Sequence, residues 1–149
     1  MFSNCEGQSK LPKDLPSNAE IIYISDGGLL PSLFRVEIRG TTMKITENSE
    51  KTERKDVVRE VKLSDNELKN LYQTFVENKF DSIKPNKNPE VADGKMRSIE
   101  LKFDGKLFFG INGDGINPPK GHGERFGKIE DAISKLVAAH TQNAETRTK

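Results

Sequence analysis

The sequence predicts an α+β fold: a mostly antiparallel sheet of about six strands with two helices packed on one face, in the order ββββ-α-ββ-α. Two patterns carry this prediction. Several stretches alternate apolar with polar residues, which is the period of a strand with one buried face. Two others repeat apolar residues every three or four positions, which is the period of an amphipathic helix.

The first four predicted strands precede the first helix. Turn signals separate them: Asp26-Gly27-Gly28 follows the first strand, and Gly40-Thr41-Thr42 follows the second. The charged connection 48–55 has no apolar side to bury, so it indicates a solvated loop; a charge-reading site is the alternative. The four strands are expected at residues 20–25, 34–38, 43–47 and 57–63.

The first helix has a clear start signal. Ser64 and Glu67 have the spacing of a capping box, in which each side chain bonds the backbone N–H of the other residue. An apolar stripe follows at helical spacing and predicts core residues, with a ligand-binding role for Tyr72 as the alternative. The stripe comprises Leu68, Leu71, Tyr72, Phe75, Val76 and Phe80.

Residues 96–112 predict a β-hairpin around Asp104-Gly105. A two-residue turn would pair Leu101 with Phe108, whereas a three-residue loop or a bulge would pair Leu101 with Phe109. We predict the second register, because it gathers six apolar side chains on one face, and burying each is worth about 1.5–3 kcal/mol. Phe108 then lies on the outer face, either as a single exposed aromatic or as part of a partner-binding surface. The six are Ile99, Leu101, Phe103, Leu107, Phe109 and Ile111.

A second helix is predicted from Glu124 to His140, followed by a polar segment without periodicity. Its apolar stripe is Phe126, Ile129, Ile133, Leu136 and Val137. The expected organisation is therefore a flexible tether over residues 1–18, a single α+β domain over 19–140 and a disordered tail over 141–149.

Composition narrows the function classes. The 24 basic and 23 acidic residues nearly cancel and do not gather beside aromatic residues, which argues against a nucleic-acid partner. One cysteine and two histidines leave little for a nitrogen and sulfur metal site, and no run of about 20 apolar residues would span a bilayer. The sequence predicts no cofactor.

Two motifs have weak chemical interpretations. Residues 112–117 alternate oxygen-bearing side chains with glycines and faintly resemble part of a calcium loop, but the further carboxylates of such a loop are missing, which favours a turn-rich connector. His122 lies between glycines, where it is either a solvated loop histidine or a general base or metal ligand. No catalytic residue is assigned. The predicted contact surface comprises Phe108, Asn112, Asp114, Asn117 and His122.

The N-terminus resembles the cleavage region of a bacterial lipoprotein. A bulky residue stands three before Cys5, and a polar, proline-containing linker follows. The resemblance implies a lipid on Cys5 and a location in the bacterial cell envelope, on the periplasmic or surface side, with the lipid as the membrane contact. An inert terminal thiol is the alternative for Cys5.

The order of the segments between Ile21 and Leu136 is similar to that of small bacterial domains of the emfourin type. The similarity rests on Gly27-Gly28, the helical segment LSDNELKNLYQTFVENKFDSI, the loop ending at Asp93-Gly94 and the Pro118-Pro119 loop. It implies inhibition of thermolysin-like metalloproteases. Three functions follow as expectations: a binding or structural domain of a cell-envelope lipoprotein, a metalloprotease inhibitor, and a hydrolase that uses His122.

Overall fold

A computed structural model describes residues 9–26, 33–48, 53, 55–83, 96–113 and 121–147. The order ββββ-α-ββ-α is confirmed, and a short 3-10 helix, η3, follows the first α-helix. The elements are β1 Glu20–Asp26, β2 Leu33–Arg39, β3 Thr42–Asn48, β4 Val57–Lys62, α1 Asp65–Glu77, η3 Phe80–Ser82, β5 Met96–Phe103, β6 Lys106–Gly113 and α2 His122–Arg147.

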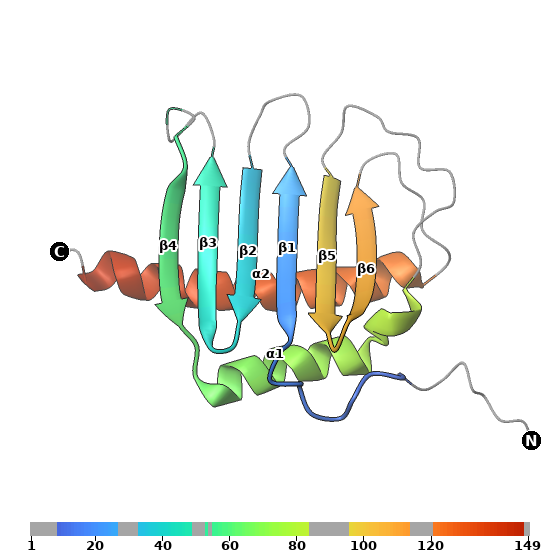
Figure 1. The fold of residues 1–149 in the computed structure, drawn as a ribbon. Coiled ribbons are helices and arrows are strands. Elements are labelled where there is room, and N and C mark those ends of the chain that lie inside the picture. Colours follow the sequence, from blue (N-terminus) through green and yellow to red (C-terminus); the bar gives the residue numbers. More distant parts are fainter. Residues whose placement is uncertain are drawn as a thin grey trace, which may run out of the picture.

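All six strands form one sheet in the order β4-β3-β2-β1-β5-β6, and every neighbouring pair is antiparallel (Figure 1). β1 is one of the two central strands and pairs with β2 on one side and with β5 on the other. The hairpin formed by β5 and β6 is therefore added beside the first strand, and β4 and β6 are the two edge strands.

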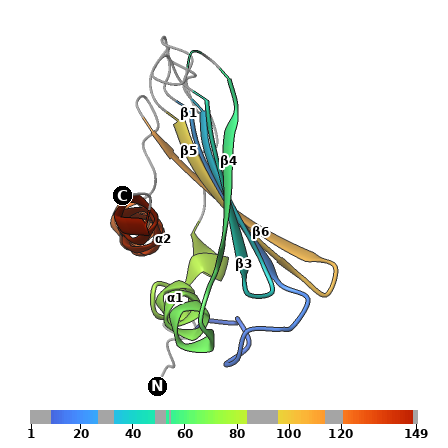
Figure 2. The same ribbon diagram turned by 90° about the vertical axis from the view of Figure 1, so that its left-hand side faces the viewer.

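Both helices lie on the same face of the sheet, as the sequence predicts (Figure 2). The core lies between this inner face and the helices. Buried residues of β1, β2, β3 and β5 meet the apolar stripes of α1 and α2 there. The helix residues that are buried include Leu71, Tyr72 and Phe75 of α1 and Phe126, Ile129, Ile133 and Val137 of α2.

The predicted capping box starts α1. The Ser64 Oγ accepts from the backbone N–H of Glu67 at 3.1 Å, and the Ser64 backbone N–H donates to Glu67 Oε1 at 2.9 Å. These bonds lower the pKa of Glu67, and the bond from the Ser64 backbone N–H has the largest effect. His140 Nε2 lies 2.9 Å from Glu67 Oε2, so the same carboxylate also joins the start of α1 to α2.

The predicted register of the hairpin is wrong. Phe103 pairs with Lys106 and Leu101 with Phe108, so the turn has two residues, Asp104 and Gly105. Both have positive φ, +50° and +74°, which is the backbone of a type I′ turn. As a result Leu107 and Phe109 face outward, 56% and 40% exposed, and do not join the floor beneath the helices.

Close packing explains why the observed register forms, although the predicted register would gather more apolar side chains on the inner face. Gly110 faces inward, where a Cβ atom would lie 3.1 Å from the Phe80 ring and 3.2 Å from the Phe126 ring. The predicted register would instead turn Phe109 and Ile111, on either side of Gly110, toward these rings. Phe108 lies on the inner side and packs on Phe103, with ring centroids 5.7 Å apart.

The structure also differs from the predicted organisation at both ends. The helix expected from Glu124 to His140 runs from His122 to Arg147, so it extends into the segment expected to be a disordered tail. Toward the N-terminus, residues 9–18 pack against the domain, and Leu11 is a buried core residue. The prolines and polar residues of this segment predicted a tether. Instead, the buried Leu11 side chain and the hydrogen bonds of the segment hold it against the domain.

Candidate binding site

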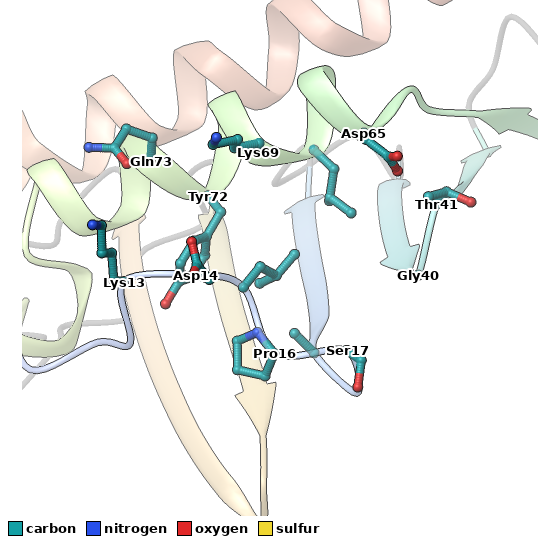
Figure 3. Close-up of a pocket in the computed structure, with 13 residues that line it drawn as sticks. Lys13, Asp14, Pro16, Ser17, Gly40, Thr41, Asp65, Lys69, Tyr72 and Gln73 are labelled. Carbon is teal, nitrogen blue, oxygen red and sulfur yellow. The ribbon is translucent and has the colours of Figure 1, made fainter.

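A pocket of about 530 Å³ lies between the N-terminal segment, α1 and the turn that joins β2 to β3 (Figure 3). The segment provides one wall and the first half of α1 provides the facing wall. Thirteen residues line the pocket: Lys13, Asp14, Leu15, Pro16, Ser17, Ala19, Gly40, Thr41, Asp65, Leu68, Lys69, Tyr72 and Gln73.

Hydrogen bonds hold the N-terminal wall at its start. Asp81 of η3 accepts from the Ser9 hydroxyl and from the Lys10 backbone N–H, both at 2.8 Å. The Tyr72 hydroxyl donates to the Pro12 carbonyl at 2.6 Å. Two elements, α1 and η3, therefore position the chain just before the first pocket residue, Lys13.

The far end of the wall is also held. The backbone N–H of Ala19 donates to the Pro16 carbonyl at 3.1 Å and closes a turn. The Asn18 side chain donates to Asp104 Oδ1 in the hairpin turn at 2.9 Å. Hydrogen bonds therefore fix both ends of this wall to the domain.

The helix wall has an apolar centre. Leu68 and Tyr72 are four residues apart, so they share one face of α1. Leu15, Pro16 and Ala19 are the apolar lining residues from the N-terminal wall. Charged and polar groups flank this centre: in Figure 3, Lys13, Asp14 and Gln73 lie toward one end of the pocket, Asp65 and Thr41 lie toward the other, and Lys69 lies between them.

Tyr72 serves mainly as a structural residue of this site. It is 2% exposed, as the packing interpretation predicts, and part of it also lines the pocket. Burial, together with the nearby carboxylates of Asp14 and Asp81, raises the pKa of Tyr72 to about 12. The hydroxyl is therefore neutral at physiological pH and its proton is engaged with the Pro12 carbonyl.

Apart from the pocket, a cluster of polar side chains links the sheet to α2. Glu130 of α2 accepts from the Tyr23 hydroxyl at 2.6 Å and from Arg97 Nη1 at 2.7 Å. Burial, followed by the hydrogen bond to Glu130, raises the pKa of the Tyr23 hydroxyl well above its usual value. The Glu130 side chain is only 13% exposed, and its two charge-assisted partners offset the cost of burying it.

Three of the five predicted contact residues, Phe108, Asn112 and His122, lie within the described part of the chain. Phe108 lies in the core layer, not on the outer face. His122 is half-buried as the first residue of α2 and makes an interaction there, and Asn112 lies in β6 opposite Arg97. Cys5, Asp114 and Asn117, and with them most of the predicted calcium loop, lie outside the described residues.

The sequence did not reveal the pocket because its composition there indicates a solvated linker. A usable signal is the pair Leu11 and Leu15, two apolar residues four apart in a polar segment. Tyr23, Arg97 and Glu130 are far apart along the chain, and no local spacing relates them. Such clusters follow from strand order and helix packing, which a single sequence does not specify.

The described residues contain no group of three or more His, Cys, Asp or Glu side chains placed to hold a metal ion. In the same part of the chain no helix is long and apolar enough to cross a membrane. No protein-family model matches this chain, and no curated protein matches it.

Proposed function

We propose that the protein is a binding domain of the bacterial cell envelope, anchored by a lipid on Cys5, whose ligand site is the pocket beneath residues 13–19. The pocket is the observation that carries the binding role, because its volume of about 530 Å³ and its mixed lining are typical of small-ligand sites. The lipoprotein-like N-terminus supports the location.

The lining also suggests the chemistry of the ligand. The apolar centre around Leu68 favours an apolar body, and the two lysines and two aspartates of the lining favour a ligand that carries both a carboxylate and an amine. A short zwitterionic peptide with apolar side chains has these groups. Its ammonium group would lie toward Asp65, where the lining has no lysine beside it, and its carboxylate toward Lys13 and Lys69.

Titration of the ¹⁵N-labelled domain with the dipeptide Leu-Leu tests the pocket. We expect amide signals of residues 13–19 and of the first half of α1 to shift, and Leu68→Glu to remove the shifts. Asn70→Glu, on an exposed position of the same helix that does not line the pocket, is the matched control. Shifts elsewhere, or none at millimolar peptide, would contradict this ligand assignment.

The anchor has its own test. Expression of the full gene in its native bacterium, followed by mass spectrometry of the N-terminal peptide, should find lipid on Cys5 and protein in the membrane fraction. The control is Cys5→Ser, which should release the protein from that fraction. A cytoplasmic, unmodified wild-type protein would exclude the anchored function.

Inhibition of a thermolysin-like metalloprotease is the second candidate, supported by the element order on which the emfourin resemblance rests. Its test is residual protease activity with the domain at micromolar concentration, where full activity would count against it. A hydrolase that uses His122 is the third candidate. If turnover of an ester substrate is found, an unchanged rate after His122→Ala would exclude that role.

A further inference from the structure

The edge strand β6 presents exposed apolar side chains. Within the described part of the sheet it pairs with β5 on one side and with no strand on the other (Figure 1). Leu107 is 56% exposed and Phe109 is 40% exposed on the face that the helices leave open. Ile111 is half-buried on the same row.

The free backbone groups of β6 belong to the same residues. The two-residue turn makes Phe103 and Lys106 a hydrogen-bonded pair, and bonded and non-bonded pairs then alternate along an antiparallel hairpin. Leu107, Phe109 and Ile111 are therefore in non-bonded pairs. Their N–H and C=O groups point away from β5, toward any strand that docks on this edge.

Among the described residues, little protects this edge from pairing. Proteins usually guard an edge strand with charges, proline or a bulge. The opposite edge strand, β4, also exposes Val57 and Val58, but Arg59, Glu60 and Lys62 follow them. In β6 the one charged residue is Lys106 at its start, and its pairing with β5 continues without a bulge to Gly113.

We propose that a second copy of this chain docks on β6, strand against strand and antiparallel, with the two-fold axis at Phe109. In this register Phe109 faces its own copy and Leu107 faces Ile111 of the second copy. The outward-bonding positions 107, 109 and 111 then each meet an apolar residue. The contact is isologous, as a two-fold dimer requires.

The neighbouring positions also suit this register. Lys106 falls opposite the neutral Asn112, so no like charges meet across the axis. Phe108, on the inner side, falls opposite Gly110, which has no side chain to oppose it. A shift of two residues in either direction places Leu107 opposite Gly113 or Ile111 opposite Gly105, so two apolar pairs remain in place of three.

Cysteine cross-linking tests the axis, in a Cys5→Ser background that removes the native thiol. In the proposed dimer the two copies of residue 109 have Cα atoms about 5.5 Å apart, within the range of a disulfide. The two copies of residue 107 are four residues out of step, about 13 Å apart. We therefore expect Phe109→Cys to form a covalent dimer under mild oxidation and Leu107→Cys alone not to.

A mixed experiment keeps Phe109 intact. Leu107→Cys protein mixed with Ile111→Cys protein should give the heterodimer in preference to either homodimer. Val58→Cys on the opposite edge is the control and should stay monomeric. Equal cross-linking of residue 107 with itself, or no cross-linking of residue 109, would overturn the proposed register.

Sedimentation equilibrium tests the dimer without cysteines. A short edge pairing buries less surface than a stable interface, so we expect a weak dimer, with a Kd on the order of 10–100 µM. Phe109→Lys should weaken it at least about tenfold, because two lysines then face each other. Val58→Lys should leave it unchanged. A wild-type chain that stays monomeric at millimolar concentration would reject a second copy as the occupant of β6.

Discussion

Gly110 of β6 lies against Phe126 of α2: a Cβ atom on this glycine would come within 3.2 Å of Cδ2 of the phenylalanine. The Phe80 ring of η3 approaches the same position to 3.1 Å. Two aromatic rings from separate elements therefore meet the sheet where β6 has no side chain. This close approach fixes which side chains of β6 face the core.

Gly110→Ala should destabilise the fold. The added methyl group must displace two buried rings, and overpacking of this kind costs about 1–3 kcal/mol. Chemical denaturation with urea measures the change. Gly127→Ala is the matched control, because no atom lies within 4 Å of the added Cβ and alanine favours a helix over glycine by about 1 kcal/mol. Equal stability of the wild type and Gly110→Ala would contradict the packing.

Two adjacent phenylalanines distinguish the observed register from the predicted one. Phe108→Ala should cost about 2 kcal/mol or more, because this side chain packs into the core beside Phe103. Phe109→Ala, on the exposed row, should cost clearly less. Denaturation at low protein concentration keeps self-association out of the comparison. The reverse ranking would favour the three-residue loop.

Arg125 joins α2 to the end of α1. Its Nη1 donates to Ser82 Oγ at 2.9 Å and to the Asn78 carbonyl, at the C-cap of α1, at 3.2 Å. Arg125→Met keeps the length of the side chain but removes these bonds, and we expect a loss of about 2 kcal/mol. Thermal unfolding measures it. Lys128→Met, at an exposed position of α2, should change stability by less than about 0.5 kcal/mol.

Alkaline pH should unfold the domain through its buried tyrosines. The pKa values of Tyr23 and Tyr72 are raised in the folded state, so the folded chain holds these protons where the unfolded chain, with a pKa near 10.0, loses them. Their stabilising effect is complete below pH 10 and is lost as the pH rises above it.

The measurement is the free energy of unfolding between pH 9 and pH 12. Tyr23→Phe should be less stable than the wild type at neutral pH by about 1 kcal/mol, since it loses the bond to Glu130, but its stability should fall less steeply above pH 10. Parallel curves for the wild type and Tyr23→Phe would show that the Tyr23 proton does not contribute.

The sequence determined most of the secondary structure. Alternation and, for the first strand, a β-rich run that ends at a turn signal located all six strands, and the capping box of Ser64 and Glu67 located the start of α1 to the residue. These signals are local, because a strand or a helix turn repeats over a few residues. They also predicted both helices on one face, since one face of most strands is polar. The pocket was not predicted, because its wall has the composition of a linker.

Tertiary structure decided the register of the hairpin, the path of the N-terminal segment and the grouping of Tyr23, Arg97 and Glu130. Counted along the sequence alone, apolar side chains favour the face that gathers six of them. Such a count does not include the rings of Phe80 and Phe126, which reach Gly110 from elements distant in the chain. A side chain at Gly110 would crowd both rings, so glycine faces inward there, and the strand turns Leu107 and Phe109 outward and leaves an apolar row at the edge of the sheet.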